Sequence, residues 1–510
     1  MRHQGLPLLP TPTQDERDPL RWPVWLKRCA IITASMTNFV TNMAGSGLSV
    51  AVPELMQEYH KPESAAVQQL TYNFLFLSIG NIFWVPVAHK FGKRASLLLS
   101  MALQAGTLVW CVTATSFSSL LAARCVQGFA GAAGESIVPE IAADIFFLHQ
   151  RAAMMSIPSD PRRRKENRQL DDGPLLSYVI LISSGSAIGP LVNSLMVQYL
   201  PSSWRAFLWL CFALAVADIG LMLFLCPESN FRRPEWDVTA IEPDATEAKA
   251  TQETFFEHEP QEEVYTVHRP SLADIIVPVR LDRELKFFWA MVAPLRLLTR
   301  PAVIWVILLY GCALSPQIIL MHVVPLLLLP RAQAPPYLFS SVSVGLVQIA
   351  ALIGFILACF GGGLLSDLIN SRIAHRRADG RVRAEDRLLS LIPGMAIGPA
   401  GCVVLAFACQ KHLHWAAIAV GFGMVSFGSV YTPNIAITYL AHRHQRDAAQ
   451  CLVLVNVVKN LVAFMFLYEA VEWVQSQGYL QLYLVMFALG VVTIGAALPL
   501  YLFHGKRHVE

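Results

Sequence analysis

The chain has 510 residues, of which 55% are hydrophobic and only 15% charged, and its mean hydropathy is +0.47. This composition is too apolar for a soluble protein of that length, so the soluble globular classes are excluded. The formal net charge of +3 gives no indication of nucleic-acid binding, because Lys and Arg lie between apolar stretches and form no single basic patch.

Apolar stretches of roughly 20 residues recur along the chain, each long enough to cross the ~30 Å hydrocarbon layer as an α-helix. Backbone N–H and C=O groups inside lipid need internal partners, which stretches this long find as helices rather than as barrel strands. The sequence therefore predicts an all-α membrane protein of twelve transmembrane helices. The predicted spans are residues 30–52, 69–88, 95–116, 119–143, 178–198, 204–226, 302–328, 341–365, 388–409, 413–440, 449–473 and 479–503.

These spans form two groups of six. The predicted divisions are a cytoplasmic tail (1–28), a first six-helix bundle (29–226), a linker (227–300), a second six-helix bundle (301–504) and a short tail (505–510). The first ~25 residues are polar and Pro-rich and lack the apolar core of a cleavable signal peptide, so the first span is expected to direct insertion.

The distribution of Lys and Arg predicts the orientation in the membrane. Nearly all of them lie in the tails, the linker and alternate loops, whereas Lys61, Arg205, Arg331 and Lys411 lie on the other side. The positive-inside rule then places both termini in the cytoplasm. The expected location is the plasma membrane, with the protein as a multi-pass monomer in the lipid bilayer.

The linker begins with an acidic stretch containing Pro and Thr (WDVTAIEPDATEAKATQETFFEHEPQEE), which is predicted to be disordered. It continues as SLADIIVPVRLDRELKFFWAMVAPLRLLTRP, which mixes basic and apolar residues. Such a pattern suits a helix that lies at the cytoplasmic membrane surface.

Several motifs occur in order across the two halves: RCVQGFAGAAGES (Arg124 to Ser136), DIFFLHQRA (Asp144 to Ala152), GSAIGP (Gly185 to Pro190), SSWRAFLWL, and GGLLSD with EDRL. Together they make the chain resemble the major facilitator superfamily, in particular a fungal branch similar to twelve-helix drug:proton antiporters. The resemblance covers nearly the whole chain. It implies two pseudo-symmetric six-helix bundles that rock about a central cavity and carry small molecules and protons.

Two cytoplasmic segments resemble the family's paired gate loops. The first, VPVAHKFGKR, has Val85 and His89 where the family has Gly and Asp, although Gly92, Lys93 and Arg94 match. This departure argues against a charged latch in the first loop. The second loop begins at Gly362 and retains Gly363 and Asp367, so a carboxylate that responds to conformation is expected there. Topological charge alone is the alternative for either loop.

Residues 158–177 (PSDPRRRKENRQLDDGPLLS) lie where similar family members would continue almost directly into the fifth span. Joining Ile157 to Tyr178 restores a continuous helix entry. The segment is interpreted as either a disordered cytoplasmic insertion or a gene-model artefact such as a retained intron.

The fourth predicted span contains both Arg124 and Glu135. Eleven positions at 100° per residue bring them within ~20° on one helix face, ~16 Å apart along it, with Gln127, Gly128 and Gly131 near the same stripe. Ionised groups inside a bilayer face a bundle interior or a water-filled cavity. The resemblance implies proton coupling at this arginine, so Glu135 is predicted to exchange a proton and Arg124 to tune it. The alternative is an arginine that binds backbone carbonyls and holds helices together.

The fifth span contains Gly185, Gly189 and Pro190, a close-packing face followed by a bend. This matches the start of the family's antiporter motif, but Asn193 and Ser194 replace its trailing glycines, and a packing role alone remains open. Lys459 lies about ten residues into the eleventh span and is expected either to snorkel or to face the cavity, paired with an anionic substrate group or an acidic side chain. Further polar candidates for the substrate cavity are Asn38, Asn42, Asn73, Asn81, Gln127, Tyr310, Gln317, Tyr431 and Asn434.

No GxxxxGK[ST] loop is present to bind nucleotide phosphates, so an ATP-driven pump is not expected. The HRHQRD loop is interpreted as a topogenic charge group rather than a metal site, and the ten cysteines as small apolar residues without metal-ligand spacing. No enzyme activity, cofactor or nucleic-acid partner is predicted. The sequence favours a proton-coupled exporter of small organic compounds, with an importer of an organic cation or nutrient, or a non-transporting sensor, as alternatives.

Overall fold

The computed structural model describes residues 2–3, 6–7, 18–146, 173–200, 203–231, 286–328, 339–376, 384–443 and 447–496. The all-α prediction is confirmed over these ranges, with one small exception. The two-residue strands β1 (Arg2–His3) and β2 (Leu6–Pro7) pair antiparallel near the start of the chain.

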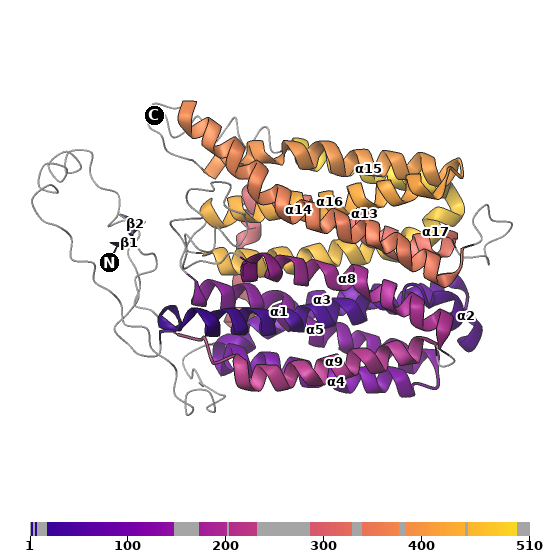
Figure 1. Cartoon of the computed structure of the whole chain (residues 1–510), viewed down its shortest axis with the longest axis horizontal. Helices are drawn as coiled ribbons and strands as arrows, with labels where there is room; N and C mark the ends of the chain where they lie inside the picture. The colour runs from indigo at the N-terminus through magenta and orange to yellow at the C-terminus, as the bar shows by residue number, and fades with distance from the viewer. Residues whose placement is uncertain are drawn as a thin grey trace, which may run out of the picture.

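The first half consists of long helices and one short one. They are α1 (Val24–Gly47), α2 (Val52–Tyr59), α3 (Glu63–Phe91), α4 (Lys93–Thr113), α5 (Phe117–Ile145), α8 (Gly173–Tyr199) and α9 (Ser203–Leu225), with the 3-10 turn η1 (Pro19–Arg21) before α1. In Figure 1 these helices, coloured indigo to magenta, run side by side, and α2 lies at one end of the bundle.

The second half is preceded by the short helix α12 (Phe287–Val292) and the 3-10 helix η3 (Ala293–Thr299). Its helices are α13 (Pro301–Leu328), α14 (Ser341–Arg376), η4 (Ala384–Leu391), α15 (Ile392–Gln410), α16 (Trp415–Arg443) and α17 (Ala448–Gly495). Helix α17 covers the eleventh predicted span and, as far as Gly495, the twelfth. Gly478 takes a positive φ of 81° inside it and divides it into two helical pieces. The second half lies alongside the first, in orange to yellow (Figure 1).

Hydropathy and length identify eight helices of the described chain as candidate membrane spans, the undivided α17 among them. Helices α1 and α5 are long enough but are not among the eight. They contain charged residues, such as Lys27 in α1 and Arg124 in α5, that lie buried against neighbouring helices. Buried polar groups lower the hydropathy of a span without exposing it to lipid.

The two predicted gate loops are shorter in the structure than in the sequence prediction. Helices α3 and α4 are separated only by Gly92, where the chain turns. Gly92 has a φ of 102°, a backbone conformation that residues with a Cβ rarely adopt. In the second half α14 continues to Arg376, so Gly363 and Asp367 lie within a helix rather than in a loop. The side chain of Asp367 is outside the described structure. The predicted acidic linker and most of residues 158–177 also lie outside the described residues.

The two halves contact each other mainly along two helix pairs. Helix α3 packs on α17, where Val85, Val453 and Val457 form a small apolar cluster and Ser78 Oγ donates to the Val457 carbonyl at 2.7 Å. Helix α8 packs on α14, where a Cβ placed on Gly345 would meet Ser194 Oγ at 1.8 Å. Both interfaces depend on small side chains, which allow helices to approach closely inside a membrane.

Candidate functional site

Glu135 of α5 and Lys459 of α17 form an ion pair across the interface between the halves. The Lys459 ammonium also lies 3.4 Å from Tyr310 Oη and 4.8 Å from the centre of that tyrosine ring. Tyr310 is in α13, so three helices meet at the pair. Of the alternatives for Lys459, the structure shows pairing with an acidic side chain of another helix.

Side-chain amides surround the Glu135 carboxylate. Asn81 Nδ2 of α3 and Asn460 Nδ2 of α17 donate to Oε2 at 2.9 and 2.7 Å, and Asn456 Nδ2 donates to the Glu135 carbonyl at 3.2 Å. Asn456, Lys459 and Asn460 fall on one face of α17, because residues three and four apart on a helix are neighbours. Their spacing therefore aims three donors at one residue of α5.

The pair is largely but not fully shielded from solvent, with 16% of the Glu135 side chain and 8% of the Lys459 side chain exposed. Two charges removed from water are stable only while they remain paired and hydrogen-bonded. Removing one partner of a buried pair lowers the stability of the folded protein by about 3–5 kcal/mol. A proton on Glu135 would neutralise the carboxylate and cancel the attraction across the interface. The arrangement is therefore suited to coupling protonation to separation of α5 from α17.

Arg124 has a different set of partners. Its guanidinium donates to the carbonyls of Ala44 and Gly45 in the last turn of α1 at 2.9 and 2.6 Å, and to Gln127 Oε1 at 2.7 Å. Carbonyls in the last helical turn lack partners within the helix and carry the negative end of the helix dipole, so they favour a cation. Arg124 is fully buried, and the contacts described for it join α5 to α1.

The glycines predicted for gating and packing lie where helices approach closely. A Cβ on Gly128 would meet the Asn73 carbonyl oxygen at 2.2 Å, and a Cβ on Gly185 or Gly189 would meet the α1 carbonyl oxygens of Phe39 or Met43 at 2.5 or 2.4 Å. Pro190 lies inside α8. These positions serve helix packing within the first half.

The other polar candidates are separated by the structure. Asn38 accepts from Asn42 at 3.4 Å, and Asn73 Nδ2 donates to the Arg124 carbonyl at 3.0 Å. Gln317 accepts from Ser426 Oγ at 2.7 Å, and Tyr431 donates to the Ser390 carbonyl at 2.9 Å. The Asn434 carbonyl accepts from Thr438. None of these hydrogen bonds involves Glu135 or Lys459; among the polar candidates, Asn81 contacts Glu135 and Tyr310 contacts Lys459.

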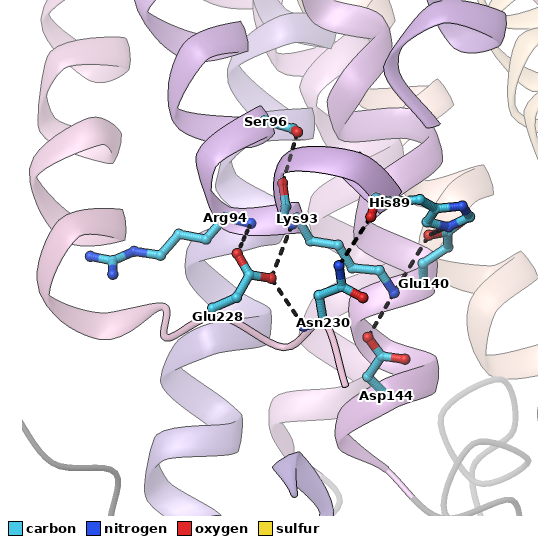
Figure 2. Close-up of polar contacts among 9 residues, drawn as sticks. His89, Lys93, Arg94, Ser96, Glu140, Asp144, Glu228 and Asn230 are labelled. Carbon is cyan, nitrogen blue, oxygen red and sulfur yellow. Dashed lines mark hydrogen bonds and ion pairs between the residues drawn. The ribbon is translucent and has the colours of Figure 1, made fainter. Parts of the chain in front are cut away.

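The end of the bundle at which α9 ends and α13 begins is called the linker end. A second charged cluster lies at this end. Figure 2 shows Lys93 extended toward two carboxylates of α5, with Nζ 2.7 Å from Asp144 Oδ2 and 3.5 Å from Glu140 Oε2. His89 Nε2 lies 3.0 Å from the same Glu140 oxygen. The expectation that the first gate segment has no charged latch is thus corrected in part: ion pairs form, but inside the first half.

Glu228 completes this linker-end cluster. Its two carboxylate oxygens accept from the backbone N–H groups of Lys93 and Arg94 at 3.0 and 3.1 Å, at the N-terminus of α4 (Figure 2). Burial raises the pKa of the Glu228 carboxyl, while the backbone N–H donors oppose that shift. A carboxylate at a helix N-terminus satisfies donors that the helix itself leaves open.

Sequence reasoning missed Glu140, Glu228, Asp218 and His322. Thr37 Oγ1 donates to Asp218 Oδ2 at 2.9 Å inside the first half, and His322 of α13 lies buried 6.2 Å from the Phe74 ring. Asp218 and His322 are isolated polar residues within apolar spans, a signal that was available in the sequence. Glu228 lies in a loop, so no periodic pattern distinguishes it.

The paired helical halves and the buried polar groups between them define a transporter-type membrane protein. The major facilitator superfamily model matches residues 34–159 and 177–467. The chain belongs to this superfamily, whose members are transporters and not enzymes, and the predicted fold is confirmed. The match omits residues 160–176, which lie inside the segment interpreted as an insertion or a gene-model artefact.

Similar proteins cover most of the chain. "Protein HOL1" of Saccharomyces cerevisiae is 23% identical over 99% of this chain and 90% of its own length. "Probable drug/proton antiporter YHK8" of the same yeast is 21% identical over 87% of this chain and 77% of its own length. The crystal structure of the human organic anion transporter MFSD10 aligns with a TM-score of 0.56 at 12% identity, covering 92% of this chain and 99% of that one. This last likeness concerns the fold alone.

Proposed function

We propose that this transporter exports small organic compounds in exchange for protons, with Glu135 as the proton-exchanging group. The observation that carries the proposal is the Glu135–Lys459 ion pair, which joins a carboxylate of one half to an ammonium of the other. Alternating access requires contacts between the halves that form and break. Protonation removes the charge of the Glu135 carboxylate and so weakens its attraction to the Lys459 ammonium.

Protonation leaves both partners with stabilising contacts. The protonated Glu135 retains the amide of Asn81, which belongs to the same half, within hydrogen-bond distance, and Lys459 retains the hydroxyl and ring face of Tyr310, which belongs to the second half. These contacts limit the cost of a buried unpaired group in the separated state. The halves can then move apart at α5 and α17 until Glu135 releases its proton and the pair forms again.

Arg124 is proposed to position α1 against α5 rather than to carry the proton. Its described partners are two backbone carbonyls and one amide oxygen, none of which titrates in the physiological range. The guanidinium stays charged and adds a fixed positive potential to the first half. Any tuning of Glu135 by Arg124 would act through that potential.

Export in exchange for protons is supported by one relative, which is named a probable drug/proton antiporter. We further propose a monomer in the plasma membrane with both termini cytoplasmic, which is supported by the positive-inside distribution of Lys and Arg.

The test uses the purified full chain in proteoliposomes with an imposed pH gradient and rhodamine 6G as a probe. Solute and protons moving in opposite directions would support export by exchange, movement in the same direction would indicate an importer, and absence of flux would favour a sensor. Glu135→Gln is expected to abolish pH-driven flux while retaining probe exchange at equal pH. Glu472→Gln, which changes an exposed carboxylate of α17, the helix of Lys459, serves as the control. Unchanged pH-driven flux in Glu135→Gln would contradict the proposal.

A further inference from the structure

The segment of residues 286–300, called the strap here, exposes several large apolar side chains. Phe288 is 80% exposed and Trp289 60%, and Val292, Leu295 and Leu298 are also exposed. The strap leads directly into α13, which begins at Pro301. Contiguous apolar exposure beside a membrane-spanning helix marks a surface that contacts another phase or a partner.

The strap is attached to both halves. Phe287 packs edge-on against Phe83 of α3, with ring centres 5.9 Å apart. Leu297 is buried among residues of the second half, and Arg300 Nη1 lies 3.0 Å from Asp447 Oδ2 at the start of α17. Since α3 and α17 form one of the two interfaces between the halves, the strap bridges that interface at the linker end.

The charges of the strap all have the same sign. It contains Lys286, Arg296 and Arg300 and no Asp or Glu. The Arg296 guanidinium lies 5.3 Å from the centre of the exposed Trp289 ring. An aromatic ring with a cation beside it suits the headgroup region, where the ring lies among glycerol groups and the cation meets phosphate.

We propose that the strap is a binding site for anionic phospholipid at the bilayer surface, with Phe288 and Trp289 inserted and Lys286 and Arg296 contacting lipid phosphate. The charge complementarity selects an anionic lipid surface over a neutral one. The position of the strap next to Pro301 holds it in the plane where headgroups lie. This site is separate from the Glu135–Lys459 pair and does not depend on the direction of transport. Because the strap bridges α3 and α17, lipid bound there also acts on the interface that must open.

The test measures Trp289 fluorescence in nanodiscs. The protein has eleven tryptophans, so the Trp289 signal is obtained as the difference between the wild type and Trp289→Phe. Lipids brominated high in the acyl chain are expected to quench this difference signal, and replacing phosphatidylcholine by phosphatidylserine is expected to increase the quenching. A double variant carrying Phe288→Trp and Trp289→Phe should restore a quenchable signal one position away.

The double variant Lys286→Gln/Arg296→Gln is expected to lose the preference for phosphatidylserine. Each basic residue removed should weaken binding to anionic lipid about fivefold at low salt. Lys411→Gln is the matched control, because Lys411 also lies over an aromatic ring, 5.6 Å from the centre of Phe407, at the opposite end of the bundle. A Trp289 signal that brominated lipid leaves unquenched would overturn the proposal. Equal quenching in neutral and anionic nanodiscs would overturn the selectivity for anionic lipid.

Discussion

The two charged clusters of this transporter use the same chemistry in different places. In the linker-end cluster Lys93 pairs with Glu140 and Asp144, and all three residues belong to the first half. In the central site the carboxylate of Glu135 belongs to the first half and the ammonium of Lys459 to the second. In the proposed mechanism the linker-end pairs stay closed when the halves rock, whereas the central pair breaks. Location relative to the interface, rather than burial or geometry, distinguishes a structural ion pair from one that can couple to transport.

The largest effect is expected at the central pair. Lys459→Met leaves the Glu135 carboxylate without its cation and should destabilise the protein by about 3–5 kcal/mol. Adding Glu135→Gln should recover most of that loss, because the double variant contains no unpaired charge, but pH-driven flux should stay absent. Thermal unfolding in nanodiscs and proteoliposome flux measure the two effects. A double variant as unstable as Lys459→Met would argue against direct coupling between the two residues.

A smaller and purely structural effect is expected at the linker-end cluster. Lys93→Met leaves Glu140 and Asp144 near each other without the ammonium that bridges them, and should destabilise the protein by about 2–4 kcal/mol. The pH dependence of flux should keep its shape in the molecules that remain folded. Lys90→Met, which changes a half-buried lysine in the last turn of α3, is the control. A shifted pH profile in Lys93→Met would place this cluster in the coupling mechanism.

The smallest effect is expected at Glu228 and should depend on pH. Because its pKa in the folded protein is raised above the ordinary value near 4.5, protonation favours the folded state. The contribution of this group to stability should therefore decline as pH rises from about 4.5 through the raised pKa. Glu228→Gln should flatten the profile of unfolding temperature in that window only. A profile identical to that of the wild type would show that its backbone donors fully offset burial.

The class of protein, the number of spans and several functional groups could be predicted from the amino-acid sequence alone. Span length follows from bilayer thickness, so apolar stretches identify helices without knowledge of their neighbours. A charge within such a stretch stands out for the same reason, and Arg124, Glu135 and Lys459 were found this way. Helix ends were less accurate: α14 continues to Arg376 because a helix can extend past the membrane where hydropathy no longer marks it.

Which of these groups contact one another depends on how the helices pack. A shared face on α5 suggested that Arg124 and Glu135 act together, but helical periodicity does not specify which neighbouring helix lies opposite each turn. Packing places the end of α1 opposite Arg124 and places α17 opposite Glu135. Glu135 and Lys459 are more than three hundred positions apart, and only the docking of two separately formed bundles brings them into contact.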